Sequence, residues 1–144
     1  MTVRISRLDL SLPLPAYHTA GSVAFDLSPR VDVTIAPGAT AMLPTNLIVE
    51  VPTGFVLLII ARSSLMKRGL VLANGVGVID QDYCGPNDEL HLALRNTTDQ
   101  PIEIKRGDRL AQGLFTPVER AEWHEIAHAA ITTATRGGWG STGK

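Results

Sequence analysis

Turn-forming residues divide this sequence into short apolar segments along almost its whole length. Glycine and proline interrupt helices and central strands, so the segments between them are short elements joined by turns. The main turn formers are Pro13, Pro15, Pro29, Pro37, Gly38, Pro52, Gly54, Gly85, Pro86, Gly107 and Asp108. This spacing is the strongest single limit on the fold.

Several of these segments alternate as half-buried strands do. Residues 31–35 read Val-Asp-Val-Thr-Ile, and residues 90–94 and 102–104 follow the same period. Residues 47–51 and 56–60 are further strand candidates. Many short strands at regular spacing predict an all-β sandwich or barrel. The 144 residues fit one domain, and the 5% aromatic content predicts an aliphatic core.

Charge and hydropathy limit the possible partners. The formal net charge is −1, so no general attraction to nucleic acid or to an anionic membrane is expected. The longest unbroken apolar run, residues 55–61, is too short to span a bilayer. The N-terminus lacks the apolar stretch of a secretory signal. Cys84 is the single cysteine, which excludes an internal disulfide, and we expect a cytoplasmic protein.

Residues 74–83, Asn-Gly-Val-Gly-Val-Ile-Asp-Gln-Asp-Tyr, give the main functional signal. An apolar run at residues 70–72, which looks like a buried strand, leads into Asn74 and Gly75, a dipeptide typical of tight turns. Asp80 ends the next apolar run, where a carboxylate needs solvent or hydrogen bonds. We predict a hairpin whose groove offers backbone N–H and C=O groups to a flat polar ligand such as a nucleobase. An ordinary hairpin with a solvated aspartate explains the same residues.

A short helix is predicted at residues 63–68, capped by Ser63 or Ser64 and closed by Gly69. A helix N-terminus gathers free N–H groups and partial positive charge, which suit phosphate. Arg62 directly before it adds a full positive charge. Plain helix capping by serine explains the same pattern, so the residues alone leave both interpretations open.

Residues 119–131 are also a helix candidate, and they contain the spacing H-E-x-x-H between His124 and His128. On a helix this spacing places two imidazoles on one face, as in zinc proteases. A zinc site needs a third protein ligand, and no His, Asp, Glu or Cys follows His128. A connector to the C-terminal residues is the simpler interpretation.

Five blocks, in this order, resemble the five motifs of the trimeric dUTPase family (deoxyuridine triphosphate nucleotidohydrolases). They read AFDL, ARSSLMKRGL, NGVGVIDQDY, RGDRLAQGLF and RGGWGSTGK, and start at Ala24, Ala61, Asn74, Arg106 and Arg136. The resemblance covers residues from about 12 to 144. It implies a distorted jelly roll with one short helix, a β domain at residues 1–135, and a flexible Gly-rich tail at residues 136–144 that closes the active site.

The resemblance also implies a reaction: hydrolysis of dUTP to dUMP and pyrophosphate by attack of water on the α-phosphate, which lowers dUTP and supplies dUMP for thymidylate synthesis. Asp80 matches the aspartate that acts as general base. Asp26 matches the aspartate that holds Mg²⁺ indirectly, through water and the substrate phosphates. A homotrimer with shared active sites is implied as well. Asp82 and Asp108 are interpreted as structural.

Substrate contacts follow from the same resemblance. Asn74 carries a donor and an acceptor that match the polar edge of uracil, and Tyr83 matches the tyrosine that leaves no space for a 2′-hydroxyl. Trp139 stands where the family usually has a phenylalanine over the base. The predicted substrate-binding residues are Arg62, Ser63, Ser64, Asn74, Gly77, Val78, Ile79, Tyr83, Gln112, Arg136, Trp139, Gly140 and Ser141.

The sequence departs from the family in two places. Only two glycines separate Arg136 from Trp139, whereas the family usually has a longer spacer. Residues 86–88 look like a small inserted turn after Gly85. The first departure affects how the tail closes, and neither touches Asp80.

Two alternatives remain. A dCTP deaminase shares the fold but needs a glutamate where this chain has Ala93. A nucleotide-sensing regulatory module on the same fold is expected to lose Asp80 or Arg136, and both are present.

Overall fold

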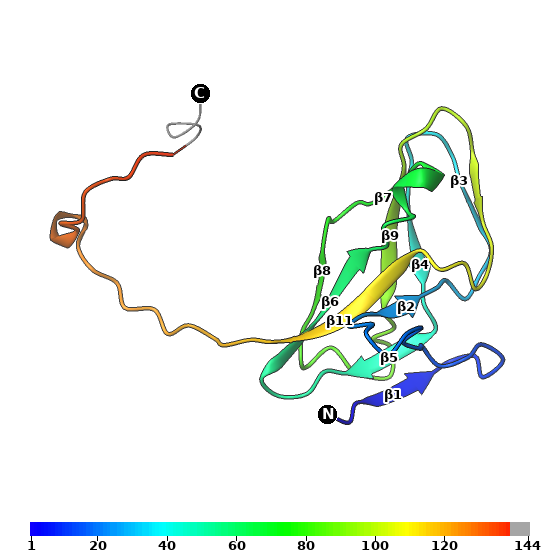
Figure 1. The fold of residues 1–144 in the computed structure, drawn as a ribbon, viewed down its shortest axis with the longest axis horizontal. Helices are drawn as coiled ribbons and strands as arrows, with labels where there is room; N and C mark the ends of the chain where they lie inside the picture. Colours follow the sequence, from blue (N-terminus) through cyan, green and yellow to red (C-terminus); the bar gives the residue numbers. More distant parts are fainter. Residues whose placement is uncertain (139–144) are drawn as a thin grey trace.

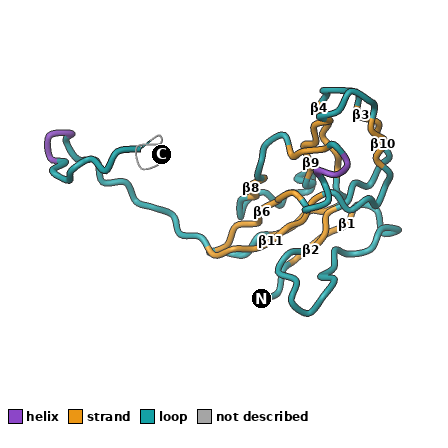
Figure 2. Tube along the Cα trace, turned by 45° about the horizontal axis from the view of Figure 1, so that its top comes forward, coloured by secondary structure: helices purple, strands orange, loops and turns teal. Residues whose placement is uncertain are grey.

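The fold consists almost entirely of short antiparallel strands (Figure 1). The computed structural model describes residues 1–138. Across that range, helix is limited to two short 3-10 turns (Figure 2), which confirms the all-β prediction. The elements are β1 (Arg4–Arg7), β2 (Phe25–Leu27), β3 (Val33–Ile35), β4 (Thr40–Pro44), β5 (Leu47–Glu50), β6 (Phe55–Ala61), η1 (Met66–Arg68), β7 (Leu70–Leu72), β8 (Gly77–Ile79), β9 (His91–Asn96), β10 (Ile102–Ile104), β11 (Ala111–Pro117) and η2 (His128–Ala130).

The strands form two larger and two smaller sheets. The larger sheets have the orders β2-β11-β6-β8 and β4-β9-β7, and the smaller ones pair β1 with β5 and β3 with β10. The longest ladder joins β11 to β6, from Ala111 opposite Ala61 to Pro117 opposite Phe55. These small sheets surround one core and meet at corners, which is the distorted jelly roll implied by the resemblance.

The core is aliphatic, as the low aromatic content predicts. In β9, Leu92 and Leu94 are fully buried, whereas His91, Ala93 and Arg95 are less so, which is the period-two pattern of a strand with one face inward. Burial of apolar area contributes about 25 cal/mol per Å². The largest fully buried side chains are Leu27, Ile35, Leu43, Val49, Leu57, Leu65, Leu70, Leu90, Leu92, Leu94, Ile104 and Leu110.

The predicted strands agree closely with the structure. Residues 70–72 and 102–104 are strands with the predicted bounds. The other predicted strands, at residues 31–35, 47–51, 56–60 and 90–94, differ by one or two residues at one end or at both ends. The spacing of the hydrophobic residues therefore predicted the positions of these strands well.

The predicted hairpin at residues 70–83 is wrong in its pairing. The turn itself forms, because Gly75 has a φ of +71° and its N–H donates to Leu72 O at 3.1 Å. However, β7 pairs with β9 while β8 pairs with β6, so the two arms enter different sheets. Turn chemistry specifies a chain reversal, but the longer strands β6 and β9 decide the partner of each arm.

The predicted helix at residues 63–68 is shorter and has no serine cap. The 3-10 turn η1 follows Leu65, and no side chain caps it. The Leu65 N–H donates to Arg62 O and the Lys67 N–H to Ser64 O, so successive turns replace the first helical turn. Gly69 closes the segment at a φ of +70°, as predicted. A segment of this length makes too few hydrogen bonds to offset the cost of helix nucleation.

Residues 119–131 are not a helix either. After β11 the chain extends away from the body as an arm with the single 3-10 turn η2 (Figure 1). Trp123 is 93% exposed, so the arm has no apolar surface to pack against within residues 1–138, and tertiary packing supplies most helix stability. His124 and His128 thus do not share a helix face. The described part of the chain contains no group of three or more His, Cys, Asp or Glu residues that could hold a metal ion.

The described residues include no helix with the length and apolar character needed to cross a membrane.

Gly113 marks a point where the β2-β11-β6-β8 sheet has no space for a side chain. A Cβ atom there would lie 2.6 Å from Phe25 Cζ and 3.2 Å from Leu57 Cδ1. We expect Gly113→Ala to lower the free energy of unfolding by about 1–3 kcal/mol, as overpacking does, when measured by urea denaturation. Gly21→Ala is the matched control, since nothing lies within 4 Å of its Cβ position. Equal stability of the two variants would contradict this packing.

Candidate active site

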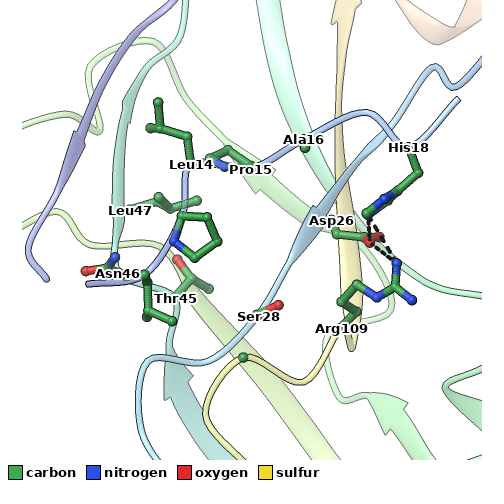
Figure 3. A pocket seen from close by; sticks show the side chains of 13 residues that line it. Leu14, Pro15, Ala16, His18, Asp26, Ser28, Thr45, Asn46, Leu47 and Arg109 are labelled. Carbon is green, nitrogen blue, oxygen red and sulfur yellow. Dashed lines mark hydrogen bonds and ion pairs between the residues drawn. The ribbon is translucent and has the colours of Figure 1, made fainter. Parts of the chain in front are cut away.

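A cluster of charged side chains lies where β2, β6 and β11 come together. The carboxylate of Asp26 on β2 is 14% exposed, and its Oδ2 lies 2.6 Å from Arg62 Nη1, 2.6 Å from His18 Nε2 and 3.3 Å from Arg109 Nη1. His18 and Arg109 approach it from separate segments (Figure 3). One carboxylate thus balances two arginines and a histidine, which leaves this end of the sheet with surplus positive charge.

The contact of Arg62 with Asp26 is a close charge pair without hydrogen-bond geometry. Arg62 Nη1 is buried, and none of the residues 1–138 accepts a hydrogen bond from it. A buried donor without an acceptor is costly. An anion seated beside Arg62 would supply the missing acceptor.

The other predicted phosphate contacts lie beside this cluster. Gln112 on β11 stands directly opposite Asp26 in the β2–β11 ladder, and its Nε2 donates to Ala61 O at 3.3 Å. Ser63 and Ser64 follow β6 in an exposed turn. The structure therefore gathers Arg62, Ser63, Ser64, Gln112 and Asp26 at one end of the β2-β11-β6-β8 sheet.

These residues can take part in holding a metal only together with a substrate. Asp26 is already engaged by two arginines and a histidine, so it does not fit a resident metal ion held by protein ligands alone. A magnesium ion keeps most of its waters and binds through substrate phosphates. One carboxylate beside a phosphate-binding end fits that kind of site, with Asp26 facing the water shell of the ion.

The turn at Asn74 lies near the same end of β6. β8 runs beside β6 with Gly77 opposite Ile59 and Ile79 opposite Leu57. Gly77 is buried, and a Cβ atom there would lie 3.1 Å from Ile59 Cβ and 3.5 Å from Asn74 Nδ2. The glycine thus lets the Asn74 amide approach the start of β8. Val78 is 61% exposed and Ile79 is half-buried, so this part of β8 is open on one side.

The corner between β7 and β8 leaves two strand edges open. β7 is bonded on one side to β9, and β8 on one side to β6, and each is the last strand of its sheet within residues 1–138. An edge strand presents free N–H and C=O groups. Such groups can form hydrogen bonds with the polar edge of a flat ligand.

Asp80 is exposed at the end of β8 and lines a groove of about 570 Å³. The groove is also lined by Phe55, Val78, Val118 and Arg120. Asp80 is exposed to solvent, which explains how a carboxylate is tolerated after Val78 and Ile79. In this position it can meet a water molecule and a ligand.

Tyr83 lies one turn beyond Asp80. Its N–H donates to Asp80 O at 3.4 Å, and its hydroxyl donates to Glu89 O at 3.2 Å. Gln81 between them donates through Nε2 to Phe55 O at 3.1 Å. The loop that carries Asp80 is therefore fixed at two points.

The structure separates Asp80 from the phosphate-binding residues of the same chain. Because Ile79 pairs with Leu57, Asp80 lies near Val56, whereas Arg62 follows the other end of β6. Six residues separate positions 56 and 62, which is about 20 Å at the strand rise of about 3.3 Å per residue. A single chain does not bring Asp80 and Arg62 to one ligand.

Of the predicted tail residues, the structure describes Arg136 alone. Arg136 is exposed on the extended arm (Figure 1). Trp139, Gly140 and Ser141 lie outside the described residues.

Two residues of the charged cluster were missed in the sequence. Arg109 follows Asp108 in the fourth block, so its place in a motif was a usable signal. His18 lies in a loop without a recognisable pattern, and only the fold brings it to Asp26.

A small β fold with a cationic end, open strand edges and an exposed carboxylate has the groups that binding and hydrolysis of a nucleotide require. A family model described as dUTPase matches residues 11–143. A deoxyuridine 5′-triphosphate nucleotidohydrolase of Shewanella baltica is 41% identical over 142 residues, which cover 96% of this chain and 91% of that protein. The chain belongs to the dUTPase family.

Solved structures agree with this assignment. The crystal structure of the dUTPase from Streptococcus mutans is 33% identical, with a TM-score of 0.75 over 83% of this chain and 98% of that chain. The dUTPase of Staphylococcus bacteriophage 80alpha, solved with dUPNHPP, has a TM-score of 0.85 over 99% of each chain. At 21% identity the second likeness supports the fold alone.

Asp26→Asn is expected to change how the cationic end binds a free anion. Removing the negative charge leaves Arg62 and Arg109 without their shared counter-charge. The binding free energy of pyrophosphate without magnesium therefore becomes more favourable by about 1 kcal/mol, which lowers its Kd roughly fivefold. Calorimetric titration of pyrophosphate in EDTA measures the change. The exposed Asp99→Asn is the control for net charge. Weaker binding by Asp26→Asn than by the wild type would contradict the assignment of this end to phosphate.

Proposed function

We propose that this protein hydrolyses dUTP to dUMP and pyrophosphate, and that Asp80 is the general base. Membership of the dUTPase family supports the substrate, and the exposure of Asp80 at the end of the open strand β8 is the observation that carries the chemistry. Asp80 accepts a proton from water, the water oxygen bonds to the α-phosphorus, and the bond from that phosphorus to the oxygen bridging to the β-phosphate breaks. Pyrophosphate leaves with that oxygen.

Uracil is recognised at the corner between β7 and β8. The side-chain amide of Asn74 offers a donor and an acceptor, and the backbone from Gly77 to Ile79 supplies further groups at the edge of β8. Cytosine reverses the donor and acceptor at part of this rim, and an unpaired buried polar group costs about 1–3 kcal/mol. The methyl group of thymine meets the narrow end of the corner.

The sugar lies against Tyr83, whose ring is 39% exposed and whose hydroxyl is bound to Glu89 O. The ring leaves no space for a 2′-hydroxyl in the role that the family resemblance implies. Deoxyribose is thereby preferred to ribose.

The triphosphate binds at a cationic end built from Arg62, Ser63, Ser64 and Gln112. Asp26 would face the water shell of a Mg²⁺ ion carried on these phosphates, and such an ion would supply positive charge to the leaving pyrophosphate. The two arginines beside the single carboxylate of Asp26, Arg62 and the more exposed Arg109, support anion binding at this place.

The active site is shared between chains of a homotrimer. A nucleotide with uracil at Asn74 and its sugar near Asp80 directs its phosphates away from Arg62 of the same chain, because Asn74 and Arg62 lie toward the same end of β6. The phosphates therefore need the cationic end of a neighbouring chain. This geometry supports the shared sites implied by the resemblance.

The C-terminal residues 136–144 close the site. Arg136 offers a bidentate fork to the terminal phosphate, and Trp139 stacks on the base, which is worth about 1–3 kcal/mol in other nucleic-acid-binding proteins. Gly140 and Ser141 complete the phosphate contacts. The extended arm at residues 118–138 gives this motif the reach to act on another chain's site (Figure 1).

The two alternative functions have less support. Ala93 lies three residues before the buried Asn96 that ends β9, so no carboxylate stands where a dCTP deaminase needs its glutamate. A regulatory module without catalysis would not require an exposed Asp80 beside a groove. A panel of dUTP, UTP, dTTP and dCTP with and without magnesium, assayed for pyrophosphate and ammonia, separates all three functions.

Asp80→Asn tests the assignment of the base. The amide keeps the shape but cannot take a proton, so we expect kcat for dUTP to fall by at least about a hundredfold with nucleotide affinity nearly unchanged. Pyrophosphate release and equilibrium binding of a non-hydrolysable analogue measure the two quantities. Asp82→Asn is the matched control, because Asp82 lines the same groove. Near-normal turnover in Asp80→Asn would remove this residue from the role of base.

Mixed trimers test whether the sites are shared. Asp80→Asn and Arg62→Gln chains are each expected to be nearly inactive alone, but refolding them together should restore about a quarter of the wild-type rate, because one site in four then combines two intact contributions from different chains. The rate is measured on mixtures of fixed total concentration. If both groups acted from one chain, the mixture would show only the average of the two inactive variants.

A further inference from the structure

Tyr83 is held from behind by the main chain of Glu89. The Tyr83 hydroxyl donates to Glu89 O at 3.2 Å, and His91 Nδ1 lies 2.8 Å from the same carbonyl oxygen. The position of the tyrosine ring therefore depends on where this one carbonyl group lies. The carbonyl precedes β9 and follows the turn at residues 85–88, in which Gly85 N–H donates to Asp88 Oδ2 at 2.7 Å.

The Glu89 side chain is locked in place in the protein interior. The residue is 6% exposed, and its carboxylate receives two hydrogen bonds from Arg30, from Nε at 2.7 Å and from Nη2 at 3.0 Å. A third comes from the Asn46 N–H at 2.7 Å. Burial alone would raise the pKa of Glu89, but these hydrogen bonds outweigh it and hold the pKa below its usual range. The carboxylate is thus charged, paired and fixed at neutral pH.

The partners of Glu89 are themselves rigid. Asn46 has a φ of +76°, a backbone conformation that residues other than glycine seldom adopt. Its side chain forms two hydrogen bonds with the backbone of Asp9. Arg30 N–H donates to Pro44 O at 2.9 Å. Two segments distant in sequence therefore converge on one carboxylate. A lock of this kind fixes the backbone of Glu89 as well as its side chain.

We propose that Arg30 and Glu89 are positioning residues for sugar selection, acting through the Glu89 carbonyl on the Tyr83 hydroxyl. This rests on the proposed function, in which Tyr83 excludes the 2′-hydroxyl. These hydrogen bonds keep the Tyr83 ring against the sugar, so the fixed ring excludes the 2′-hydroxyl of ribose sterically. Loosening the lock lets the ring withdraw and makes room for the 2′-hydroxyl.

The Asp80 side of the loop has a separate anchor, which makes the proposal specific. Gln81 Nε2 donates to Phe55 O at 3.1 Å at the start of β6. Loss of this bond moves Asp80, so turnover of dUTP and UTP should fall in parallel. Loss of the Glu89 lock moves Tyr83, so the ratio between the two substrates should change.

The experiment measures kcat/KM for UTP and for dUTP in a set of variants. Glu89→Gln, Arg30→Met and Tyr83→Phe are each expected to raise the UTP-to-dUTP ratio on the order of tenfold, as loss of a positioning hydrogen bond allows. Glu103→Gln is the matched control, since Glu103 pairs with Lys105 on the exposed surface and lies on β10, in the separate β3–β10 sheet. Gln81→Leu should lower both values and leave their ratio unchanged.

The variants also test each other. Tyr83→Phe removes the hydroxyl without disturbing the ion pair, so it reports on the proposal even where Glu89→Gln folds poorly. The double variant Glu89→Gln with Tyr83→Phe should show no more than the effect of one change, because both break the same link. Additive effects, or an unchanged ratio in Tyr83→Phe, would overturn the proposal.

A measurement without substrate separates this inference from the proposed function. The chain has two tyrosines, so incorporation of 3-fluorotyrosine gives two ¹⁹F signals, assigned with Tyr17→Phe. Glu89→Gln should shift or broaden the Tyr83 signal and Glu103→Gln should not. An unmoved Tyr83 signal would overturn the lock whatever the activity. A wild-type protein that released no pyrophosphate from dUTP would instead refute the proposed function.

Discussion

The hydrogen-bonded ladder between β6 and β11 determines most of what this molecule can do. It is the longest pairing in the structure, and it places β2 on one flank of the sheet and β8 on the other. Each end of the ladder thereby receives a different set of functional groups. Arg62 follows one end of the ladder and Gln112 lies within it at that end, whereas Asp80 lies beside the other end. The length of one strand pair sets the distance between two halves of an active site.

This distance connects the fold to its assembly. A site split across a sheet cannot be completed by local motion, because the ladder that separates its halves is also the framework of the core. In the proposed function, a second copy completes the site, oriented so that one end meets the other. The same reasoning applies to the extended arm, which carries Arg136 away from its own sheet. The proposed shared site would make oligomerisation a condition of catalysis.

The sequence predicted the elements better than their partners. Strict alternation located β10 and the apolar run located β7, because period is a local property. Pairing of β8 with β6 was missed, since Asn74 and Gly75 encode a reversal that fits a hairpin equally well. The helix at residues 63–68 and the one at residues 119–131 were over-predicted, because capping residues and helical spacing carry no information about length or packing. Within the site, the motif residues were found by resemblance, whereas His18 and Glu89 depend on contacts between segments far apart in the chain.

The open edge of β8 has a consequence for how the chain behaves before it assembles. A strand edge with exposed valines, such as Val76 and Val78, is the kind of surface on which unrelated chains add further strands and aggregate. Here the edge extends over three residues, Gly77–Ile79, and the turn at Gly75 bends the chain away at once. So short a row gives an intruding strand few hydrogen bonds to make. The same brevity that admits a single planar base therefore protects newly made protein from pairing with the wrong neighbour.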